Sequence, residues 1–225
     1  MSSKGVLLIG ATGRTGSSVL SDAIARGIHV TALVRNPDKL LPQTGLTIVK
    51  GSPTKIEDIL TAISASPTPI TVIITTLNAP RASDSPFAKS IAPPRLMVDT
   101  HLAIIAAMKT HPEIKKMVTL SAFGVGDSVP NTPWLLNLLF RHTNMASQFA
   151  DHDAVEIEVK KSGAPFVLVK PMRLTDGAKK EIKHWENQGK GMSMLASISR
   201  DSVAKFLVDV VESMEWDNQT PVISN

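Results

Sequence analysis

Short apolar runs alternate along the chain with stretches in which apolar residues recur roughly every three or four positions. The runs suit strands covered on both faces, which have no polar side to alternate with. We expect strands at 6–9, 28–34, 46–50, 70–75, 114–120, 166–171 and 220–224, the last at the sheet edge. The periodic stretches predict helices at 19–24, 56–63, 94–108 and 203–211. Strands alternating with helices predict an α/β fold, with a mostly parallel sheet and helices on both faces.

The segment 154–161 carries a conflicting signal. Val155, Ile157 and Val159 alternate with charged residues, which is the pattern of a half-buried strand. Two parallel strands need a crossover connection, however, and no other segment just before 166–171 supplies one. We therefore expect a helix here, and with it a single doubly wound domain over residues 1–225.

Three glycines, Gly10, Gly13 and Gly16, follow the first strand. Glycine has no Cβ, so the backbone can turn tightly and approach a bound group closely. A strand, a glycine turn and a helix N-terminus together form an anion site, whose usual occupant is a dinucleotide pyrophosphate. A purely structural turn is the alternative. We expect cofactor contacts along this turn, at Gly10, Thr12, Gly13, Arg14, Thr15 and Gly16.

Arg35 ends the second strand, roughly 20 positions beyond the glycine turn, where such a fold meets the adenosine ribose. An acidic residue there would bind the 2′-hydroxyl of NAD, whereas a guanidinium suits the 2′-phosphate of NADP. Arg14, within the turn, is expected to converge on the same phosphate. The alternative for Arg35 is a solvated strand end. The two arginines together favour NADP(H) as the cofactor.

These motifs resemble one superfamily over nearly the whole chain. The turn GATGRTG at 10–16, Ser121 after the fifth strand, the segment 170–177 and the helix start at 198–204 occur in the order typical of atypical short-chain dehydrogenases/reductases. The likeness is greatest to NmrA-like NAD(P)-binding proteins and to the biliverdin reductase B or flavin reductase type. It implies a Rossmann-like domain with further cofactor contacts at Ser52, Thr75, Thr76, Leu77, Ser121, Ala122, His152, Pro171, Met172 and Arg173. Ser52 replaces the aspartate usual in relatives, which weakens the transfer of that contact.

The chain contains no tyrosine, so it lacks the phenol acid of tyrosine-dependent relatives. Alignment with those relatives implies that Gln148 and His152 occupy the places of their tyrosine and lysine. The pair Asp151 and His152 resembles instead the biliverdin reductase B type, in which such a pair lies near cofactor and substrate. The resemblance therefore implies that Ser121 and His152 orient the acceptor or supply a proton. The alternatives are a hydroxyl that only closes a strand end and a histidine on the helix surface.

Composition narrows the range of partners. The formal net charge is +4, but the basic residues are scattered, so nucleic acid is not an expected partner. No apolar run approaches the length of a membrane span, and no leader-like segment precedes the first strand, which favours a cytoplasmic protein. Without cysteine, disulfides and thiolate ligands are excluded, and no metal site is expected. We expect a monomer or homodimer that binds a small-molecule substrate.

Three functions are compatible with these features. The first is an NADP(H)-dependent oxidoreductase that moves hydride to a small aromatic or conjugated acceptor. The alternatives are an NmrA-like protein that senses the NADP(H) ratio, and a non-redox isomerase or dehydratase on the same fold. Two long loops, 79–94 and 125–133, flank the expected site. The first is either a substrate lid or a plain excursion, and the apolar segment 134–140 is either pocket wall or ordinary core.

Overall fold

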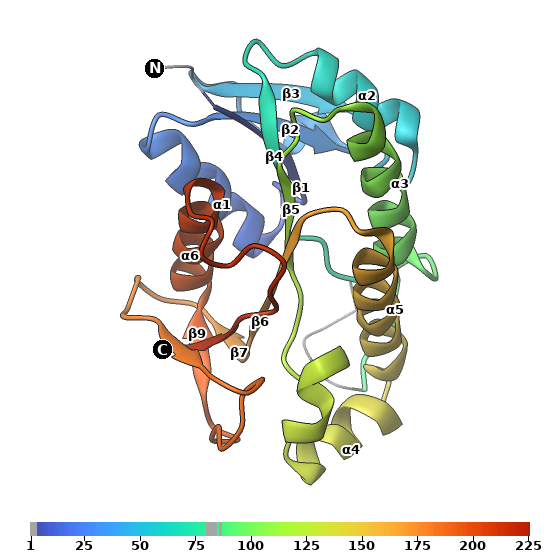
Figure 1. The fold of residues 1–225 in the computed structure, drawn as a ribbon, viewed down its shortest axis with the longest axis vertical. Helices are drawn as coiled ribbons and strands as arrows, with labels where there is room; N and C mark the ends of the chain where they lie inside the picture. Colours follow the sequence, from blue (N-terminus) through green and yellow to red (C-terminus); the bar gives the residue numbers. More distant parts are fainter. Residues whose placement is uncertain (1–3, 80–84, 86) are drawn as a thin grey trace.

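A computed structural model describes residues 4–79, 85 and 87–225. Its main feature is an eight-stranded sheet that crosses the molecule between two layers of helices (Figure 1). In spatial order the strands are β3 (Leu46–Lys50), β2 (His29–Val34), β1 (Gly5–Ile9), β4 (Ile70–Thr75), β5 (Lys116–Leu120), β6 (Phe166–Pro171), β10 (Val222–Ser224) and β8 (Lys183–Trp185). All neighbours pair in parallel except β10 and β8, which are antiparallel.

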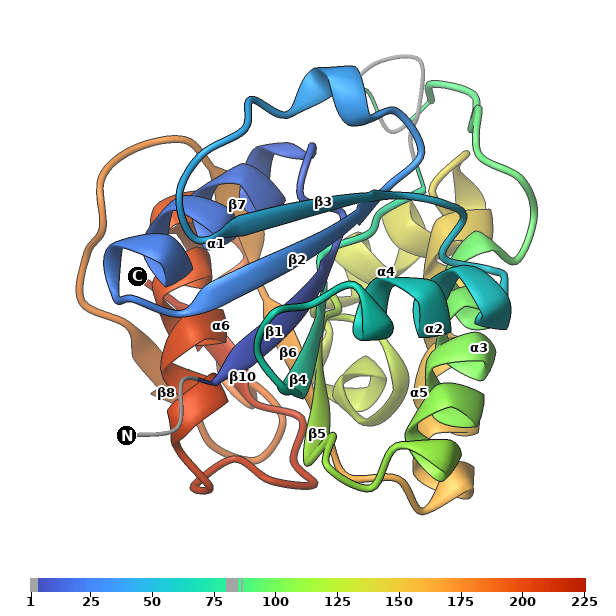
Figure 2. The ribbon, with the colours of Figure 1, turned by 90° about the horizontal axis from the view of Figure 1, so that it is seen from above.

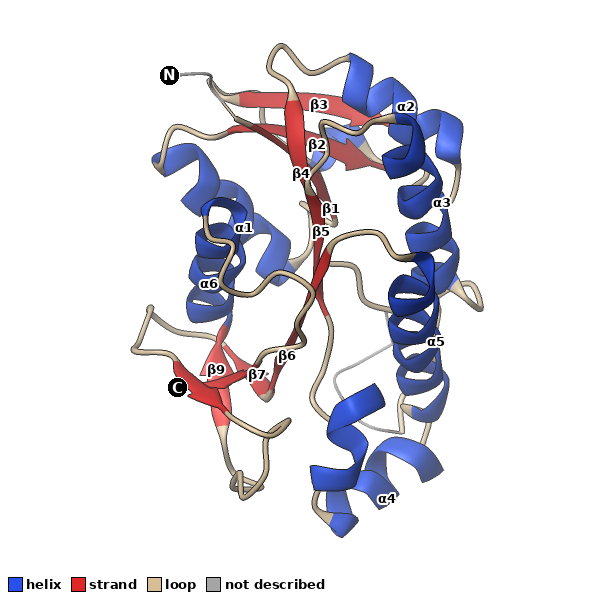
Figure 3. Cartoon of the chain, viewed as in Figure 1, coloured by secondary structure: helices blue, strands red, loops and turns tan. Residues whose placement is uncertain are grey.

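The helices cover both faces of this sheet (Figure 3). One face carries α1 (Arg14–Ala25) and α6 (Arg200–Glu212), and the other carries α2 (Ile56–Ser64), α3 (Leu96–Thr110) and α5 (Ala146–Ser162). Seen from above, the strands fan out between these two layers, with the twist usual for a parallel sheet (Figure 2). The predicted fold, a doubly wound and mostly parallel sheet with helices on both faces, is confirmed.

Alternate residues of each central strand feed the two halves of the core. In β1, Val6 and Leu8 pack toward α1 and α6, whereas Leu7 and Ile9 pack toward α2, α3 and α5. Because successive side chains of a strand point to opposite faces, a strand buried on both faces must be apolar throughout. This requirement explains why the central strands appear in the sequence as unbroken apolar runs.

The segment 154–161, whose pattern suggested a strand, lies within helix α5 as predicted. Val155 and Val159 are one helical turn apart and both are buried against the sheet, whereas Ile157 is 63% exposed. The alternation therefore reflects one exposed apolar side chain and not a two-residue period. The helix supplies the crossover between β5 and β6 that the parallel pairing of these strands requires.

Other expectations need correction. The last strand does not lie at the sheet edge, because β8 pairs with the outer side of β10. The loop 125–133 contains a short 3-10 helix at Gly126–Asn131. The expected lid at 79–94 falls partly outside the described residues, since 80–84 and 86 are not described. In the described part of the chain, no helix combines the length and apolar character that crossing a membrane requires.

Candidate functional site

A pocket of about 430 Å³ opens at the carboxyl ends of the parallel strands. It lies beside the switch point between β1 and β4, where the order of the strands in the sheet changes direction. It is assembled from the segments that follow β1, β2, β4, β5 and β6, together with α5 and the start of α6. The lining residues are Gly10, Thr12, Gly13, Arg14, Thr15, Arg35, Thr76, Leu77, Asn78, Leu120, Ser121, Ala122, Gln148, His152, Pro171, Met172, Leu174 and Arg200.

The glycine turn forms one wall of this pocket. Gly10 has a φ of +97°, a left-handed value that disfavours any side chain. A Cβ on Gly16 would lie 2.0 Å from the Gly10 carbonyl oxygen, so only glycine lets α1 begin this close to β1. The Thr76 hydroxyl, 3.3 Å from the same carbonyl oxygen, joins the turn to the end of β4.

The turn presents the N-terminus of α1 to the pocket. Gly13 is the N-cap residue; no side chain caps the first turn, and no acidic residue lies in it. The first-turn N–H groups therefore keep their capacity to bind an anion, and the helix dipole adds to the attraction. A backbone cradle that a Cβ would fill and a helix start without side-chain caps fit the pyrophosphate of a dinucleotide.

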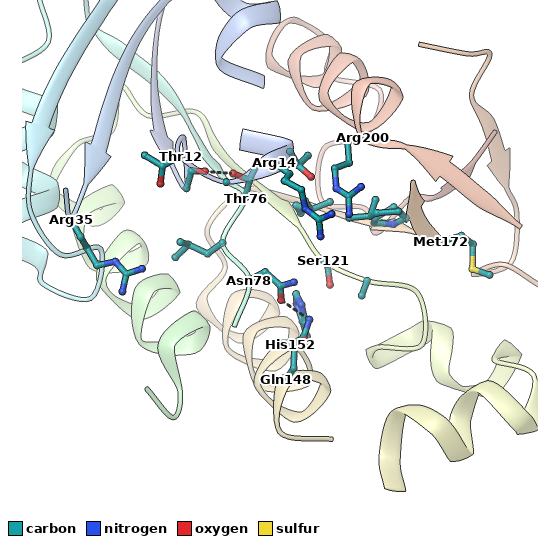
Figure 4. Close-up of a pocket in the computed structure, with 18 residues that line it drawn as sticks. Thr12, Arg14, Arg35, Thr76, Asn78, Ser121, Gln148, His152, Met172 and Arg200 are labelled. Atoms are coloured by element: carbon teal, nitrogen blue, oxygen red, sulfur yellow. Dashed lines mark hydrogen bonds between the residues drawn. The ribbon is translucent and has the colours of Figure 1, made fainter. Parts of the chain in front are cut away.

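Three arginines line the pocket, and among the described residues no carboxylate does. Arg35 lies at one end, whereas Arg14 and Arg200 point into the middle (Figure 4). The Arg14 and Arg35 guanidiniums lie well apart in this view, so the expected convergence of both on one phosphate is not present in the structure. Arg200 forms an ion pair with Asp176, at 2.5 Å.

The other end of the pocket is polar but uncharged. Ser121 follows β5, Asn78 follows β4, and Gln148 and His152 project from one face of α5, one turn apart (Figure 4). The Gln148 side-chain amide donates a hydrogen bond to Oδ1 of Asn78, which links α5 to the end of β4. Structure and sequence agree on the place of Ser121 and His152: both line the pocket, and both are more than nine-tenths buried.

His152 is a neutral imidazole at physiological pH. Burial lowers its pKa to about 3, assisted by the nearby His101 ring and opposed by Asp153. Its Nδ1 is buried, and no described residue forms a hydrogen bond with it. Of the two roles expected for His152, hydrogen bonding by a neutral ring fits this environment and proton donation by an imidazolium does not.

His101 lies behind the pocket, fully buried on α3. Its Nδ1 lies 2.7 Å from the Met97 carbonyl oxygen and its Nε2 lies 2.9 Å from Oγ1 of Thr119. A carbonyl can only accept, so Nδ1 carries the proton and Nε2 accepts from the threonine. Burial lowers the pKa of His101 as well, so the ring is neutral. His101 does not line the pocket, and its hydrogen bond with Thr119 joins α3 to β5.

The partner expected for His152 has a different role. The Asp151 carboxylate accepts hydrogen bonds from the backbone N–H groups of Met97, at 2.9 Å, and Val98, at 3.0 Å. It caps the N-terminus of α3, where the N-cap residue Arg95 offers no side-chain acceptor. Of the expected Asp–His pair, His152 lines the pocket and Asp151 does not.

A buried ion network supports the loop behind Ser121. The Lys170 ammonium is fully buried; it lies 2.9 Å from the Glu156 carboxylate and donates to the Val125 carbonyl oxygen at 3.0 Å. Burial lowers the pKa of Lys170, and the ion pair with Glu156 opposes this shift. The Gly126 N–H donates to Asp153 at 2.9 Å. Side chains of β6 and α5 thus fix the loop that follows the pocket wall.

Four predicted cofactor residues do not line the pocket. Gly16 packs against Gly10, and Thr75 is buried within β4. The Ser52 N–H donates to the Asp58 carboxylate at 2.7 Å, which holds this turn away from the site. Arg173 is exposed on β7 (Arg173–Thr175), a strand that pairs with β9 (Ser197–Ser199).

Five lining residues were not among the predicted contacts: Asn78, Leu120, Gln148, Leu174 and Arg200. Asn78 directly follows the predicted stretch 75–77 and could have been included. Arg200 begins α6, and helices of a doubly wound fold run antiparallel to the strands, so that their N-termini lie at the ligand edge. That rule could have identified Arg200. The alignment that places Gln148 at the position of the relatives' tyrosine could have identified Gln148.

Several side chains of the apolar segment 134–140 lie neither in the core nor in the wall of the pocket. The segment begins α4 (Trp134–His142), whose Trp134 is 78% exposed, with Leu135 and Leu138 half-exposed. No α4 residue lines the pocket. Leu136 and Phe140 pack inward: Leu136 lies against the buried cluster of Phe123, Met172, Met192 and Val222, and Phe140 stacks on Phe149 of α5 with ring centroids 4.2 Å apart.

Known proteins share this architecture. ChuY, an anaerobillin reductase from Escherichia coli O157:H7, is 20% identical with a TM-score of 0.74, over 98% of this chain and 96% of that chain. The oxidoreductase ylbE from Lactococcus lactis is 16% identical with a TM-score of 0.71, over 98% and 90%. A wide-type short-chain dehydrogenase/reductase from Veillonella parvula, solved in complex with NADP, is 14% identical with a TM-score of 0.72, over 99% and 94%.

At these identities the structural likeness establishes the fold and nothing finer. The family described as NAD(P)H-binding matches residues 10–214, which is most of the chain and includes the glycine turn. The sheet order and the pocket at the switch point agree with that match. The chain therefore belongs to this NAD(P)H-binding family.

Proposed function

We propose that this protein is an NADP(H)-dependent oxidoreductase that transfers hydride to a small conjugated or aromatic acceptor without a catalytic tyrosine. The observation that carries the proposal is the polarity of the pocket: arginines and a helix N-terminus occupy one part, and neutral polar side chains the other. NADPH, when bound, supplies the hydride. The protein contributes mainly by holding donor and acceptor in register, which accounts for much of the rate in cofactor enzymes.

Arg35 would select the cofactor. Its exposed guanidinium, at the end of β2, lies at the end of the pocket away from Ser121 (Figure 4). A guanidinium can donate two hydrogen bonds to a phosphate, whereas the 2′-hydroxyl of NADH gives it no charge to pair with.

Ser121 and His152 would orient the acceptor. Because the His152 ring is neutral, it can form a hydrogen bond with the hydride acceptor or with a ribose hydroxyl. It is not an imidazolium and so does not serve as the proton donor. Water entering the pocket would then protonate the reduced acceptor. The small size of Ser121 and Ala122 leaves the adjoining wall open to a flat molecule.

Cofactor selection can be tested by titrating NADPH and NADH against the wild type and Arg35→Glu. Losing a charged hydrogen bond lowers affinity by about 10- to 100-fold, and we expect that loss for NADPH only. Arg173→Glu is the matched control, because Arg173 is exposed and outside the pocket. Equal loss for both nucleotides, or none in Arg35→Glu, would refute the assignment of the 2′-phosphate.

Hydride transfer can be tested separately by following nicotinamide absorbance with quinones, flavins and enones as acceptors. We expect at least one class to be reduced, and Ser121→Ala/His152→Ala to lower kcat while leaving NADPH affinity within about threefold, as befits groups that orient the acceptor. Binding of NADPH without reduction of any acceptor would favour a sensor. Turnover of a substrate without change in absorbance would favour an isomerase or dehydratase.

A further inference from the structure

The side-chain oxygen of Gln148 is a buried hydrogen-bond acceptor that nothing in the described part of the chain satisfies. The residue is 9% exposed and lines the pocket, and its amide nitrogen already donates to Asn78. In this structure the amide nitrogen is on the Asn78 side, which leaves the oxygen as the unpaired atom. A buried acceptor left without a donor is costly, so a donor from a bound molecule would stabilise it.

His152 adds a second unsatisfied atom one helical turn away. Its Nδ1 is buried and has no hydrogen-bond partner among the residues that the structure describes, and the neutral ring offers one donor and one acceptor nitrogen. Residues four apart on a helix lie on the same face, so Gln148 and His152 present adjoining polar groups to the same part of the pocket (Figure 4).

The lining residues at this end of the pocket, Asn78, Ser121 and Ala122, are uncharged, whereas Arg14 and Arg200 point into the middle and Arg200 is paired with Asp176. A carboxylate placed against the Gln148 oxygen would therefore meet a second acceptor. A neutral group with an N–H or O–H would instead satisfy the orphaned oxygen.

We propose that Gln148 and His152 form a subsite for an uncharged group that donates a hydrogen bond, an amide N–H or a hydroxyl, beside the position of the nicotinamide ring. Gln148 supplies the acceptor oxygen, and Asn78 positions it. This inference rests on the proposed function in one respect: that the neighbouring group is the nicotinamide ring of the cofactor. The donor can come from the acceptor molecule or from the carboxamide of the nucleotide itself.

Three isosteric probes test the subsite: benzamide carries the N–H donor, acetophenone lacks it, and benzoate replaces it with a negative charge. Their affinities can be measured by ligand-observed NMR, with and without saturating NADP⁺, where no turnover occurs. A second pair, NADP⁺ and its analogue with a methyl ketone in place of the carboxamide, tests the nucleotide as source. One hydrogen bond corresponds to a preference of about tenfold for the donor-bearing member.

The variants separate hydrogen bonding from shape. Gln148→Leu removes the oxygen and should abolish the tenfold preference, whereas Gln148→Glu keeps an oxygen in place and should retain the preference while weakening benzoate further. Gln219→Leu is the matched control. Gln219 donates one hydrogen bond, to the Glu215 carbonyl oxygen, and lies beside the start of β6, at the opposite end of the strands from the pocket. Circular dichroism establishes that each variant is folded.

A preference for benzamide that Gln148→Leu removes supports a subsite for the acceptor molecule. A preference for NADP⁺ over its ketone analogue that Gln148→Leu removes supports the same subsite filled by the nucleotide. The proposal is overturned if the wild type discriminates neither pair, if Gln148→Leu leaves the discrimination intact, or if benzoate binds best. Failure to bind NADP⁺ while the benzamide preference persists would refute the proposed function and leave the subsite standing.

Discussion

Replacing Gly16 with alanine tests the packing on which the cofactor end of the pocket depends. The added Cβ would lie 2.0 Å from the Gly10 carbonyl oxygen, 2.7 Å from its carbon and 2.7 Å from Oγ1 of Thr76. Two of these atoms are backbone, so no side-chain rotation relieves the clash. Helix α1 must instead move away from β1 by more than about 1 Å, since a carbon and an oxygen do not approach much closer than ordinary van der Waals contact.

The magnitude follows from two opposing effects. Overpacking a tight site costs about 1–3 kcal/mol, and a backbone clash this close belongs at the upper end. Alanine in place of glycine within a helix returns about 1 kcal/mol. We therefore expect Gly16→Ala to lower the free energy of unfolding by about 2 kcal/mol, and to weaken NADPH binding at least tenfold, because the N–H groups of α1 lose their alignment.

Gly13→Ala in the same turn is the matched comparison. Its φ is −81°, which any residue adopts, and the added Cβ would lie 3.3 Å from the Gly10 carbonyl oxygen. We expect a loss below about 1 kcal/mol, the ordinary effect of alanine at an N-cap. Urea unfolding followed by circular dichroism measures both. A Gly16→Ala protein as stable as the wild type, or a Gly13→Ala protein that loses as much, would refute the reasoning.

Three further results are expected. Lys170→Met should lower the free energy of unfolding by about 3 kcal/mol, because the buried carboxylate of Glu156 loses a partner. The double variant Lys170→Met/Glu156→Gln should lose less stability than the two single variants combined. Additive losses in urea unfolding would contradict this coupling. His101 and His152 are neutral in the folded state with lowered pKa values, so the unfolded state binds more protons below the ordinary histidine value of 6.5. Unfolding free energy should then fall by up to about 1.4 kcal/mol per pH unit for each histidine as pH drops from about 6.5 to 5, and His152→Gln should show a shallower slope; an identical slope would argue against a buried neutral ring. Ser199→Ala removes the cap of α6, whose hydroxyl accepts from the Ser202 N–H at 3.1 Å, and should cost about 1 kcal/mol in urea unfolding, whereas an unchanged midpoint would mean that the cap is replaced by water.

The sequence was sufficient where structure is encoded locally. The apolar runs predict the central strands, since burial on both faces leaves no other choice. The glycines predict the turn because Gly10 needs its left-handed φ and Gly16 has no room for a Cβ. Ser199 as the cap of α6 also follows from a few neighbouring residues. These features depend on interactions within one turn or one strand.

Features that depend on tertiary packing could not be predicted in this way. Asp151 caps a helix that begins more than 50 residues earlier in the chain, so its carboxylate is bound to the backbone of α3 and does not face the pocket with His152. The prediction that β10 lies at the sheet edge was wrong, because β8 pairs with its outer side. The three residues of β8 carry no apolar pattern from which a strand could be predicted. Gln148 has a defined orientation only because Asn78 reaches it from another strand end.

This division has a consequence for how the family diversifies. The cofactor end of the pocket is fixed by the glycine turn and the start of α1, which tolerate few residues, whereas the other end is assembled by single side chains from β4, β5 and α5 that no backbone geometry constrains. A chain can therefore keep the whole architecture at 20% identity, as the likeness to ChuY shows, while the group facing the acceptor changes residue by residue. On the proposed function, the chemistry would be decided at Asn78, Ser121, Gln148 and His152, which line this end of the pocket and where a substitution is expected to change hydrogen bonding without changing the fold.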